Sequence, residues 1–230
     1  GTGANVITAI NALADTTAYS ITGGADSDTI RLGRGNFTVN GVGGSDVIVV
    51  DANATAGSRF SITGGTSNTI TLALGSATVT GGTGNDTIVA GAGNATITGN
   101  GGNDSVTLGS GLVTLTLGAG NDTVAAGSGA ATISAGAGLN VINAVNATAD
   151  NTAYSITGGA DSDAITVGRG TFIIKGNNGT SNTGESDTIT VDASSTTNSS
   201  YAITGGPSSK IVLALGSSTV IGGTGNDTVT

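Results

Sequence analysis

GGTGNDTIV occupies residues 81–89, and nearly the same sequence returns at residues 222–230 as GGTGNDTVT. Both stretches place a glycine-rich segment and an Asn-Asp pair directly before alternating β-branched residues. Glycine permits the positive φ of a tight reversal, and β-branched residues favour extended strands. The pattern therefore predicts a tight turn that leads into a short strand.

The turn belongs to a nonapeptide repeat. One apolar residue marks each segment, and through the centre of the chain it recurs at every ninth position: Val79, Ile88, Ile97, Val106, Leu115, Val124, Ile133 and Ile142. Elsewhere five steps are longer, which indicates inserted loops, and four of the five fall on the same kind of turn. A fixed short period is the sequence signature of a solenoid.

Alternate nonapeptides differ two positions before the marker. One set has mostly Asp there, and the other has small, apolar or aromatic residues, so two nonapeptides form one structural unit. This pattern predicts an all-β protein, a right-handed parallel β-solenoid of about eleven coils, with loop insertions on one edge. Six aromatic residues are expected to fill the corner of the solenoid beside the inserted loops rather than to bind sugar: Tyr19, Phe37, Phe60, Tyr154, Phe172 and Tyr201.

A longer period lies over the short one. AYSITGGADSD at residues 18–28 returns without change at residues 153–163. We expect a single continuous solenoid over residues 1–230, with one supra-repeat over 1–135 and an incomplete second one over 136–230. Solenoid ends need polar capping segments, and none is visible, so we expect the chain to be a piece of a longer array.

Charge and composition narrow the function. Fifteen acidic against six basic residues give a net charge of −9, which disfavours nucleic acid and anionic membrane surfaces as partners. No apolar run is long enough to insert into a bilayer. The chain has no His or Cys, and its acidic residues recur as a lattice, with no unique pair, so we expect no enzymatic activity.

The recurring Asp residues form a column. Equivalent residues of successive units lie above one another in adjacent coils, about 4.8 Å apart. Like charges at that distance repel by about 1 kcal/mol in water and by roughly 3–4 kcal/mol at an effective dielectric near 20. No Lys or Arg lies in these turns, so Ca²⁺, which accepts carboxylate and backbone carbonyl oxygens, is the natural counter-ion. The alternative is that each Asp caps its own turn by hydrogen bonding local N–H groups.

These turns resemble the GGxGxDxUx nonapeptide of the RTX, or haemolysin-type calcium-binding, β-roll, which occurs in surface-layer proteins and large adhesins. Weaker matches include GNGGNDSVT at 99–107 and LGAGNDTVA at 117–125. The resemblance implies Ca²⁺ shared between stacked turns, with Asp86, Asp104, Asp122 and Asp227 as the foremost ligands, followed by Asp28, Asp46, Asp163 and Asp187, and with Asp26 and Asp161 as additional ligands where the fourth-position glycine is replaced.

The chain departs from the family pattern on its other edge. The opposite turns, AGAGNA (90–95), LGSGLV (108–113) and AGSGAA (126–131), contain no Asp, so calcium is expected along one edge only. Within that edge, Asn68, Asn140 and Ser209 stand where Asp is expected and should interrupt the row of ions.

These features lead us to expect a calcium-stabilised extracellular structural protein of a bacterium, a segment of a surface layer, an adhesin or a matrix fibre. Folding coupled to Ca²⁺ would be followed by self-association into a lattice or fibre, and the resemblance implies type I secretion. Two alternatives stay open. Outward Thr-x-Thr pairs, such as Thr78/Thr80 and Thr96/Thr98, are compatible with an ice-binding face. The chain is also compatible with the secretion module of a larger RTX exoprotein.

Overall fold

A computed structural model describes residues 3–10, 14–51, 53–177 and 185–230. All regular structure in these residues is β-structure, so they include no helix that could cross a membrane. Contacts group the chain into two compact units, Gly1–Thr114 and Leu115–Thr230, which are described separately. The continuity of the solenoid and the supra-repeats over 1–135 and 136–230 stay predictions.

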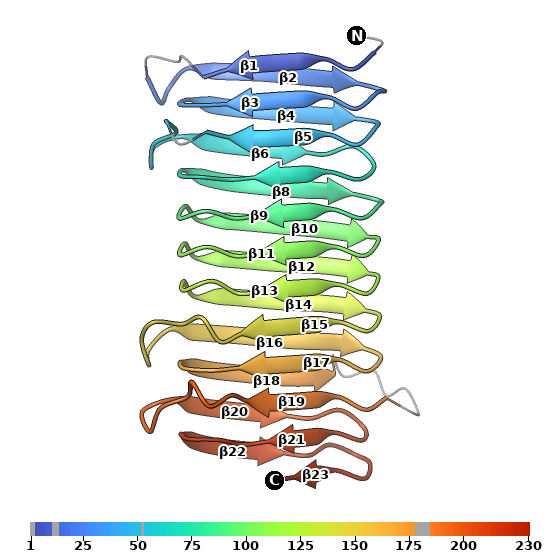
Figure 1. The fold of residues 1–230 in the computed structure, drawn as a ribbon, viewed down its shortest axis with the longest axis vertical. Coiled ribbons are helices and arrows are strands. Elements are labelled where there is room, and N and C mark those ends of the chain that lie inside the picture. Colours follow the sequence, from blue (N-terminus) through green and yellow to red (C-terminus); the bar gives the residue numbers. More distant parts are fainter. Residues whose placement is uncertain (1–2, 11–13, 52, 178–184) are drawn as a thin grey trace. The chain divides into compact units, whose positions relative to one another are not determined.

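The first unit has strands in two parallel sheets (Figure 1), with the odd-numbered strands in the order β1-β3-β5-β7-β9-β11 and the even-numbered ones in the order β2-β4-β6-β8-β10. Their bounds are β1 Val6–Ala9, β2 Ala18–Gly24, β3 Thr29–Leu32, β4 Asn36–Val42, β5 Val47–Val50, β6 Arg59–Thr63, β7 Thr69–Thr71, β8 Ser76–Gly82, β9 Thr87–Val89, β10 Ala95–Gly101 and β11 Ser105–Thr107. Strand β12, Val113–Ala119, includes the boundary between the units.

The second unit repeats this arrangement, with the orders β13-β15-β17-β19-β21-β23 and β14-β16-β18-β20-β22. Its strands are β13 Thr123–Ala125, β14 Ala131–Ala137, β15 Val141–Ala144, β16 Ala153–Ala160, β17 Ala164–Val167, β18 Thr171–Asn177, β19 Thr188–Val191, β20 Ser200–Thr204, β21 Lys210–Val212, β22 Ser217–Ile221 and β23 Thr228–Val229.

Strand register confirms the predicted coil. Ile88 of β9 pairs with Val106 of β11, and Val79 of β8 pairs with Ile97 of β10, so the partners in each pair are two nonapeptides apart. Ile88 is 0% exposed and Val106 is 1% exposed, so the marker residues form the core between the two sheets. Alternation along each strand turns the flanking Thr residues outward. The chain is a parallel β-roll, as the period predicted.

The six aromatic rings form two stacks beside the inserted loops. Phe37 lies between Tyr19 and Phe60, with ring centroids 4.8 Å and 5.7 Å away and nearly parallel planes. In the second unit, Phe172 lies in the same way between Tyr154 and Tyr201, at 4.7 Å and 5.6 Å. Each stack follows the inserted loops in its unit, because the loops precede the strands β2, β6, β16 and β20.

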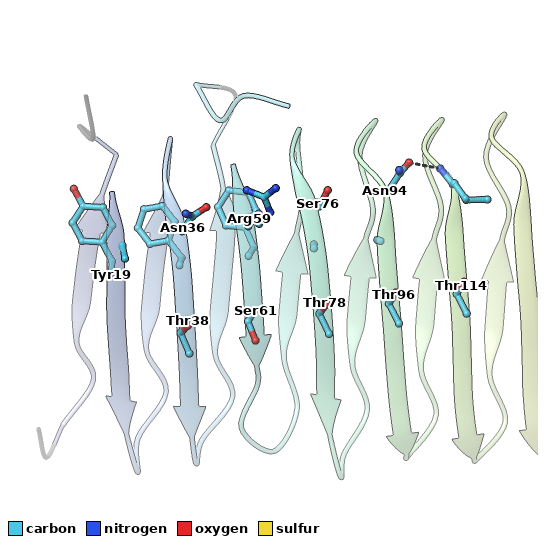
Figure 2. Close-up of a pocket in the computed structure, with 16 residues that line it drawn as sticks. Tyr19, Asn36, Thr38, Arg59, Ser61, Ser76, Thr78, Asn94, Thr96 and Thr114 are labelled. Carbon is cyan, nitrogen blue, oxygen red and sulfur yellow. Dashed lines mark hydrogen bonds between the residues drawn. The ribbon is translucent and has the colours of Figure 1, made fainter. Parts of the chain in front are cut away.

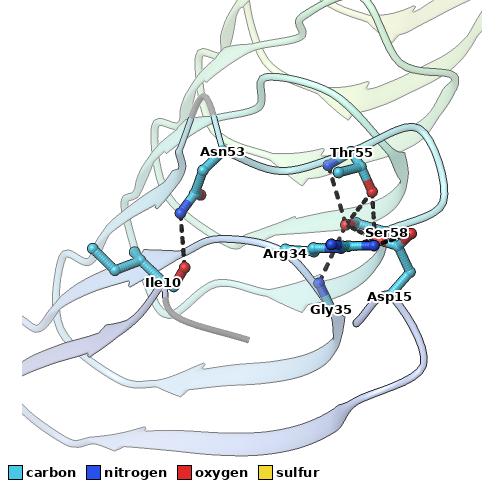
Figure 3. A network of polar contacts seen from close by, with 7 residues as sticks. All are labelled: Ile10, Asp15, Arg34, Gly35, Asn53, Thr55 and Ser58. Atoms are coloured by element: carbon cyan, nitrogen blue, oxygen red, sulfur yellow. Dashed lines mark hydrogen bonds and ion pairs between the residues drawn. The ribbon is translucent and has the colours of Figure 1, made fainter. Parts of the chain in front are cut away.

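The inserted loops of the first unit are joined by a polar network (Figure 3). The Nε–H of Arg34 donates to Oδ1 of Asp15 at 3.0 Å, and the hydroxyls of Thr55 and Ser58 donate to the same oxygen. Asn53 adds a bond from Nδ2 to the carbonyl oxygen of Ile10 at 2.7 Å. These bonds tie together loops from three successive coils. The remaining insertion, between β18 and β19, contains residues 178–184, which lie outside the described residues.

Candidate calcium-binding row

The recurring Asp side chains point into the protein. Each stands two residues before a buried marker, and residues two apart on a strand point to the same side. The structure accordingly buries seven of them, Asp28, Asp46, Asp86, Asp104, Asp122, Asp163 and Asp187, with at most 2% of each residue exposed. Charged residues are rarely buried this fully without a partner of opposite charge.

One oxygen of six of these carboxylates joins two adjacent coils. The backbone N–H of Asp28 donates to Oδ1 of Asp46 at 2.9 Å, and the N–H of Asp86 donates to Oδ1 of Asp104 at 2.8 Å. In the second unit, the N–H of Asp163 donates to Oδ1 of Asp187 at 3.0 Å. These bonds connect successive coils, whereas the turn-capping alternative requires bonds within one turn.

The second oxygen has a different environment. Among the described residues, Oδ2 is buried and has no hydrogen-bond partner in Asp28, Asp46, Asp86, Asp163 and Asp187. A buried carboxylate oxygen without a donor is costly, because its hydration is lost and nothing replaces it. A ligand that supplies positive charge is therefore expected next to these atoms.

The burial also changes the acidity of the row. Burial raises the pKa of Asp46, Asp86 and Asp187 above the usual value for Asp, and hydrogen bonds to the carboxylates oppose the shift only in part. Burial is also the main cause for Asp163, with a further contribution from the charges of Asp187 and Asp161, and its pKa rises to about 7. Without a cation, these four carboxyl groups therefore hold their protons more tightly than an exposed Asp does.

Glycine leaves open the space beside Oδ2. A Cβ atom on Gly81 would lie 2.2 Å from Oδ2 of Asp86 and 3.2 Å from the carbonyl oxygen of Gly99 in the next coil. A Cβ on Gly158 would likewise lie 2.3 Å from Oδ2 of Asp163 and 2.6 Å from the oxygen of Gly176. A side chain on either glycine would fill the space that borders a carboxylate and a carbonyl oxygen.

This oxygen set fits Ca²⁺. Calcium takes six to eight oxygen ligands and tolerates irregular geometry, and these residues offer carboxylate and backbone oxygens. The described residues include no group of three or more acidic, His or Cys side chains around one point. Backbone carbonyls would therefore provide most of the ligands, with the row's carboxylates providing the negative charge. When bound, Ca²⁺ supplies the positive charge that the unpartnered oxygens lack.

Three further predicted ligands lie elsewhere or differ. Asp26 and Asp161 are exposed on the turns, outside the buried row, and their Oδ2 atoms accept the N–H of Gly3 at 2.5 Å and of Gly138 at 3.1 Å. Asp227 is half-buried, and its Oδ1 accepts the N–H of Ser209 at 2.8 Å as in the rest of the row. The assignment of Ca²⁺ to individual Asp residues stays a prediction for all ten.

Sequence reasoning missed two contributors to these turns. The residue directly before the Asp is a Ser or an Asn, and its side-chain oxygen accepts an N–H from the following coil. Oδ1 of Asn85, for example, accepts the N–H of Asn103 at 2.7 Å. Its recurrence in the NDT triplet was the available signal. Glu185 is 4% exposed, and its Oε1 accepts the N–H of Asp161 at 3.2 Å. Its place at the fourth position of a turn, like that of Asp161, was the signal there.

A family model for the RTX calcium-binding nonapeptide repeat matches the chain at residues 20–48, 80–115, 98–133, 116–144 and 215–230. The chain therefore contains RTX calcium-binding repeats. No curated protein and no solved structure matches the chain significantly. The matched RTX segments contain Asp28, Asp46 and the run from Asp86 to Asp122, together with Asp227.

Asp163 and Asp187 lie outside the matched RTX segments. They nevertheless resemble Asp28 and Asp46. All four are buried, accept an N–H at Oδ1, and have no hydrogen-bond partner at Oδ2 among the described residues. The RTX geometry therefore extends into a stretch of sequence that the family model does not cover.

Proposed function

We propose that the protein is a secreted, calcium-stabilised structural protein, a segment of a bacterial surface layer, adhesin or matrix fibre, that folds on binding Ca²⁺. The proposal rests on buried carboxylates whose second oxygens have no donor among the described residues, those of Asp28, Asp46, Asp86, Asp163 and Asp187. A role in structure also agrees with the repetition of one turn along the chain, since an active site needs a unique constellation.

The proposed mechanism couples folding to calcium. In the unfolded chain the Asp side chains are hydrated, whereas the fold buries them beside one another. A ligand that binds only the folded state stabilises it by mass action, so calcium favours the coils over the unfolded chain. At low calcium, as in the cytoplasm, the chain stays unfolded and competent for export, and the higher calcium outside the cell completes the fold.

Self-association into a lattice or fibre is the second part of the proposal. Apolar side chains stand exposed at strand ends and turns of both edges, among them Val42 at 56%, Leu112 at 58% and Leu139 at 57%. Exposed apolar groups favour contacts between molecules. Calcium acts on this step indirectly, because the turns have these positions only in the folded coils.

Calcium titration of EDTA-treated protein tests both parts. Far-UV circular dichroism follows folding, and size-exclusion chromatography with light scattering follows assembly, with Mg²⁺ as the control ion. We expect a coil-to-β transition with Ca²⁺, a much weaker response to Mg²⁺, and growth of large particles after folding. Full β-structure in EDTA would contradict calcium-coupled folding, and a calcium-loaded monomer at high concentration would contradict assembly.

A second candidate, ice binding, is favoured by one observation. In the first unit, exposed hydroxyl side chains stand in register across the even-numbered sheet, in the row Thr38, Ser61, Thr78, Thr96 and Thr114 (Figure 2). The row borders a shallow groove of about 660 Å³. Neighbouring members are about 4.8 Å apart, which gives a regular polar lattice.

The second unit lacks this regularity. Thr132 and Ser155 of its corresponding row are followed by Ile173 and Ala202. Thermal hysteresis of the calcium-loaded protein tests the candidate. Thermal hysteresis that is present in the unmodified protein and lost in Thr78→Lys would favour ice binding. If the unmodified protein freezes in the same way as buffer, ice binding is rejected. Asn94→Lys, at the edge of the groove and outside the row, is the matched control.

A further inference from the structure

Three asparagines occupy positions of the buried row that elsewhere contain Asp: Asn5, Asn68 and Asn140. Replacing a carboxylate by an amide removes a negative charge and adds an –NH₂ group with two donors. What these donors contact determines whether the exchange merely removes a calcium ligand or also replaces the calcium.

Asn68 makes hydrogen bonds with every part of its side chain. Its Nδ2 donates to the carbonyl oxygen of Gly81 at 2.9 Å and to Oδ1 of Asp86 at 2.8 Å, both in the following coil. Its Oδ1 accepts the N–H of Gly65 at 2.8 Å and, more weakly, that of Asp46 at 3.3 Å in the preceding coil. One buried amide therefore links three successive coils.

The following position of the row shows what the amide replaces. Oδ2 of Asp86 and the oxygen of Gly99 border the space that Gly81 leaves open, and Oδ2 has no donor among the described residues. At Asn68, the corresponding space, beside Gly64, contains Nδ2: a Cβ on Gly64 would lie 2.4 Å from Nδ2 and 2.4 Å from the Gly81 oxygen. The amide N–H groups thus reach a carbonyl and a carboxylate that would otherwise face each other with only negative charge.

The other two asparagines share part of this arrangement. Nδ2 of Asn5 donates to Oδ1 of Asp28 in the following coil at 2.8 Å and to the oxygen of Gly3 in its own turn at 2.8 Å. Nδ2 of Asn140 donates to the oxygen of Gly138 in its own turn at 3.0 Å, and a side-chain hydrogen bond of Asn140 to Asp163 in the following coil opposes the rise in the pKa of that carboxyl. Ser209 differs, since its Oγ accepts the N–H of Gly206 at 2.6 Å and serine has no amide nitrogen.

We propose that Asn5, Asn68 and Asn140 are calcium-free clasps, in which the amide Nδ2 takes the place of the cation between adjacent coils. The clasps divide the row into separate calcium-binding segments: in the first unit, one with Asp28 and Asp46 and one with Asp86 and Asp104, and in the second unit, one with Asp163 and Asp187. Each clasp also holds its neighbouring coils together before calcium binds.

Asn68→Asp tests the proposal directly. It joins two segments by placing a carboxylate between Asp46 and Asp86. We expect the variant to bind more calcium per chain than the unmodified protein in equilibrium dialysis, and to need a higher calcium concentration for half-maximal folding by circular dichroism. Asn85→Asp adds the same charge on the exposed side of the turn in the following coil, and is expected to change neither quantity appreciably.

Asp86→Asn is the reverse test and guards against a variant that fails to fold. It places a second amide next to Asn68, so we expect fewer bound calcium ions and more residual β-structure in EDTA. The proposal is overturned if Asn68→Asp binds the same amount of calcium with the same midpoint as Asn85→Asp, or if Asp86→Asn has less β-structure in EDTA than the unmodified protein.

The inference rests on calcium-coupled folding, and the two can fail separately. If the unmodified protein keeps its full β-structure in EDTA, the proposed function fails. If the unmodified protein shows the calcium transition while the two Asp variants behave alike, only the clasps fail.

Discussion

Arg34 and Asp15, which lie in adjacent coils, form an ion pair with Nε 3.0 Å from Oδ1. The second unit contains the same pair as Arg169 and Asp150, at 2.9 Å, and Asp150 likewise accepts the hydroxyl of Thr196. The longer period of the sequence therefore repeats a specific loop–loop contact as well as a strand pattern. The Arg34 guanidinium and the Thr55 hydroxyl hold the pKa of Asp15 below its usual value.

Arg34→Gln should loosen the inserted loops while leaving the coils intact. The pair is half-exposed, so its contribution to global stability is small, but the loops have few other ties. We expect faster limited proteolysis before β2 and β6, with a melting temperature lowered by only a few degrees. Arg59→Gln, which removes an exposed arginine from the sheet face, is the control, and equal cleavage of both variants would contradict the role of Arg34.

Phe37→Ala should destabilise the first unit strongly. Phe37 is 2% exposed and lies between two stacked rings, so truncation leaves a cavity. Buried Phe→Ala replacements cost about 3–5 kcal/mol. Denaturant unfolding at saturating calcium measures the loss. Thr38→Ala alters the adjacent outward residue and should cost far less; a similar loss in the two variants would argue against the aromatic stack as a source of stability.

Without calcium, the fold should become less stable as the pH rises from about 4 to about 7. The folded pKa of Asp163 is raised from 3.8 to about 7, mainly by burial. The folded state therefore binds the proton more tightly than the unfolded state, and this advantage disappears once the pH passes the folded pKa. Thermal unfolding in EDTA across this range measures the effect, and Asp163→Asn should flatten the profile.

Gly81→Ala should weaken both the fold and calcium binding. The added methyl would lie 2.2 Å from Oδ2 of Asp86, which forces the carboxylate or the turn to move. Overpacking of this kind typically costs about 1–3 kcal/mol. Calcium dialysis and thermal unfolding give the two readouts. Thr83→Ala, on the exposed part of the same turn, is the matched control; unchanged calcium binding in Gly81→Ala would show that the space beside Oδ2 is not used.

The coil and its core could be predicted because they follow from periodicity alone. Once Ile88 and Val106 are two nonapeptides apart and both apolar, stacking places them together in the core. Asp86 is two residues before Ile88, so the alternation along a strand also places its side chain inside. We expected this side chain only at the edge, because the sequence does not show how a turn orients a carboxylate. In Asp86, Oδ1 accepts an N–H, whereas Oδ2 has no donor in the described part of the chain, and this difference depends on atomic geometry.

The loop contacts could not be predicted for a different reason. The sequence shows Arg34 and Arg169 at equivalent positions of the longer repeat. Their partners, however, lie in inserted loops, whose conformation the repeat does not determine. Likewise, Asn68 was expected only to interrupt the ion row. Its contacts with Gly81 and Asp86 emerge only when both neighbouring coils are in place.

The two side-chain ladders of the turns run in opposite directions. In the buried row the N–H groups donate to a side-chain oxygen of the next coil, as from Asp86 to Asp104 and from Asp122 to Asn140. On the exposed side each N–H donates to the preceding coil, as from Asn103 to Asn85. The two faces of a coil therefore differ. The face toward the following coil has N–H donors in the buried row and side-chain acceptors on the exposed side. The face toward the preceding coil has acceptors in the buried row and N–H donors on the exposed side. Any coil-on-coil stacking of separate molecules that continues these ladders must be head-to-tail, which gives the assembly a polarity and leaves it no two-fold axis at the junction.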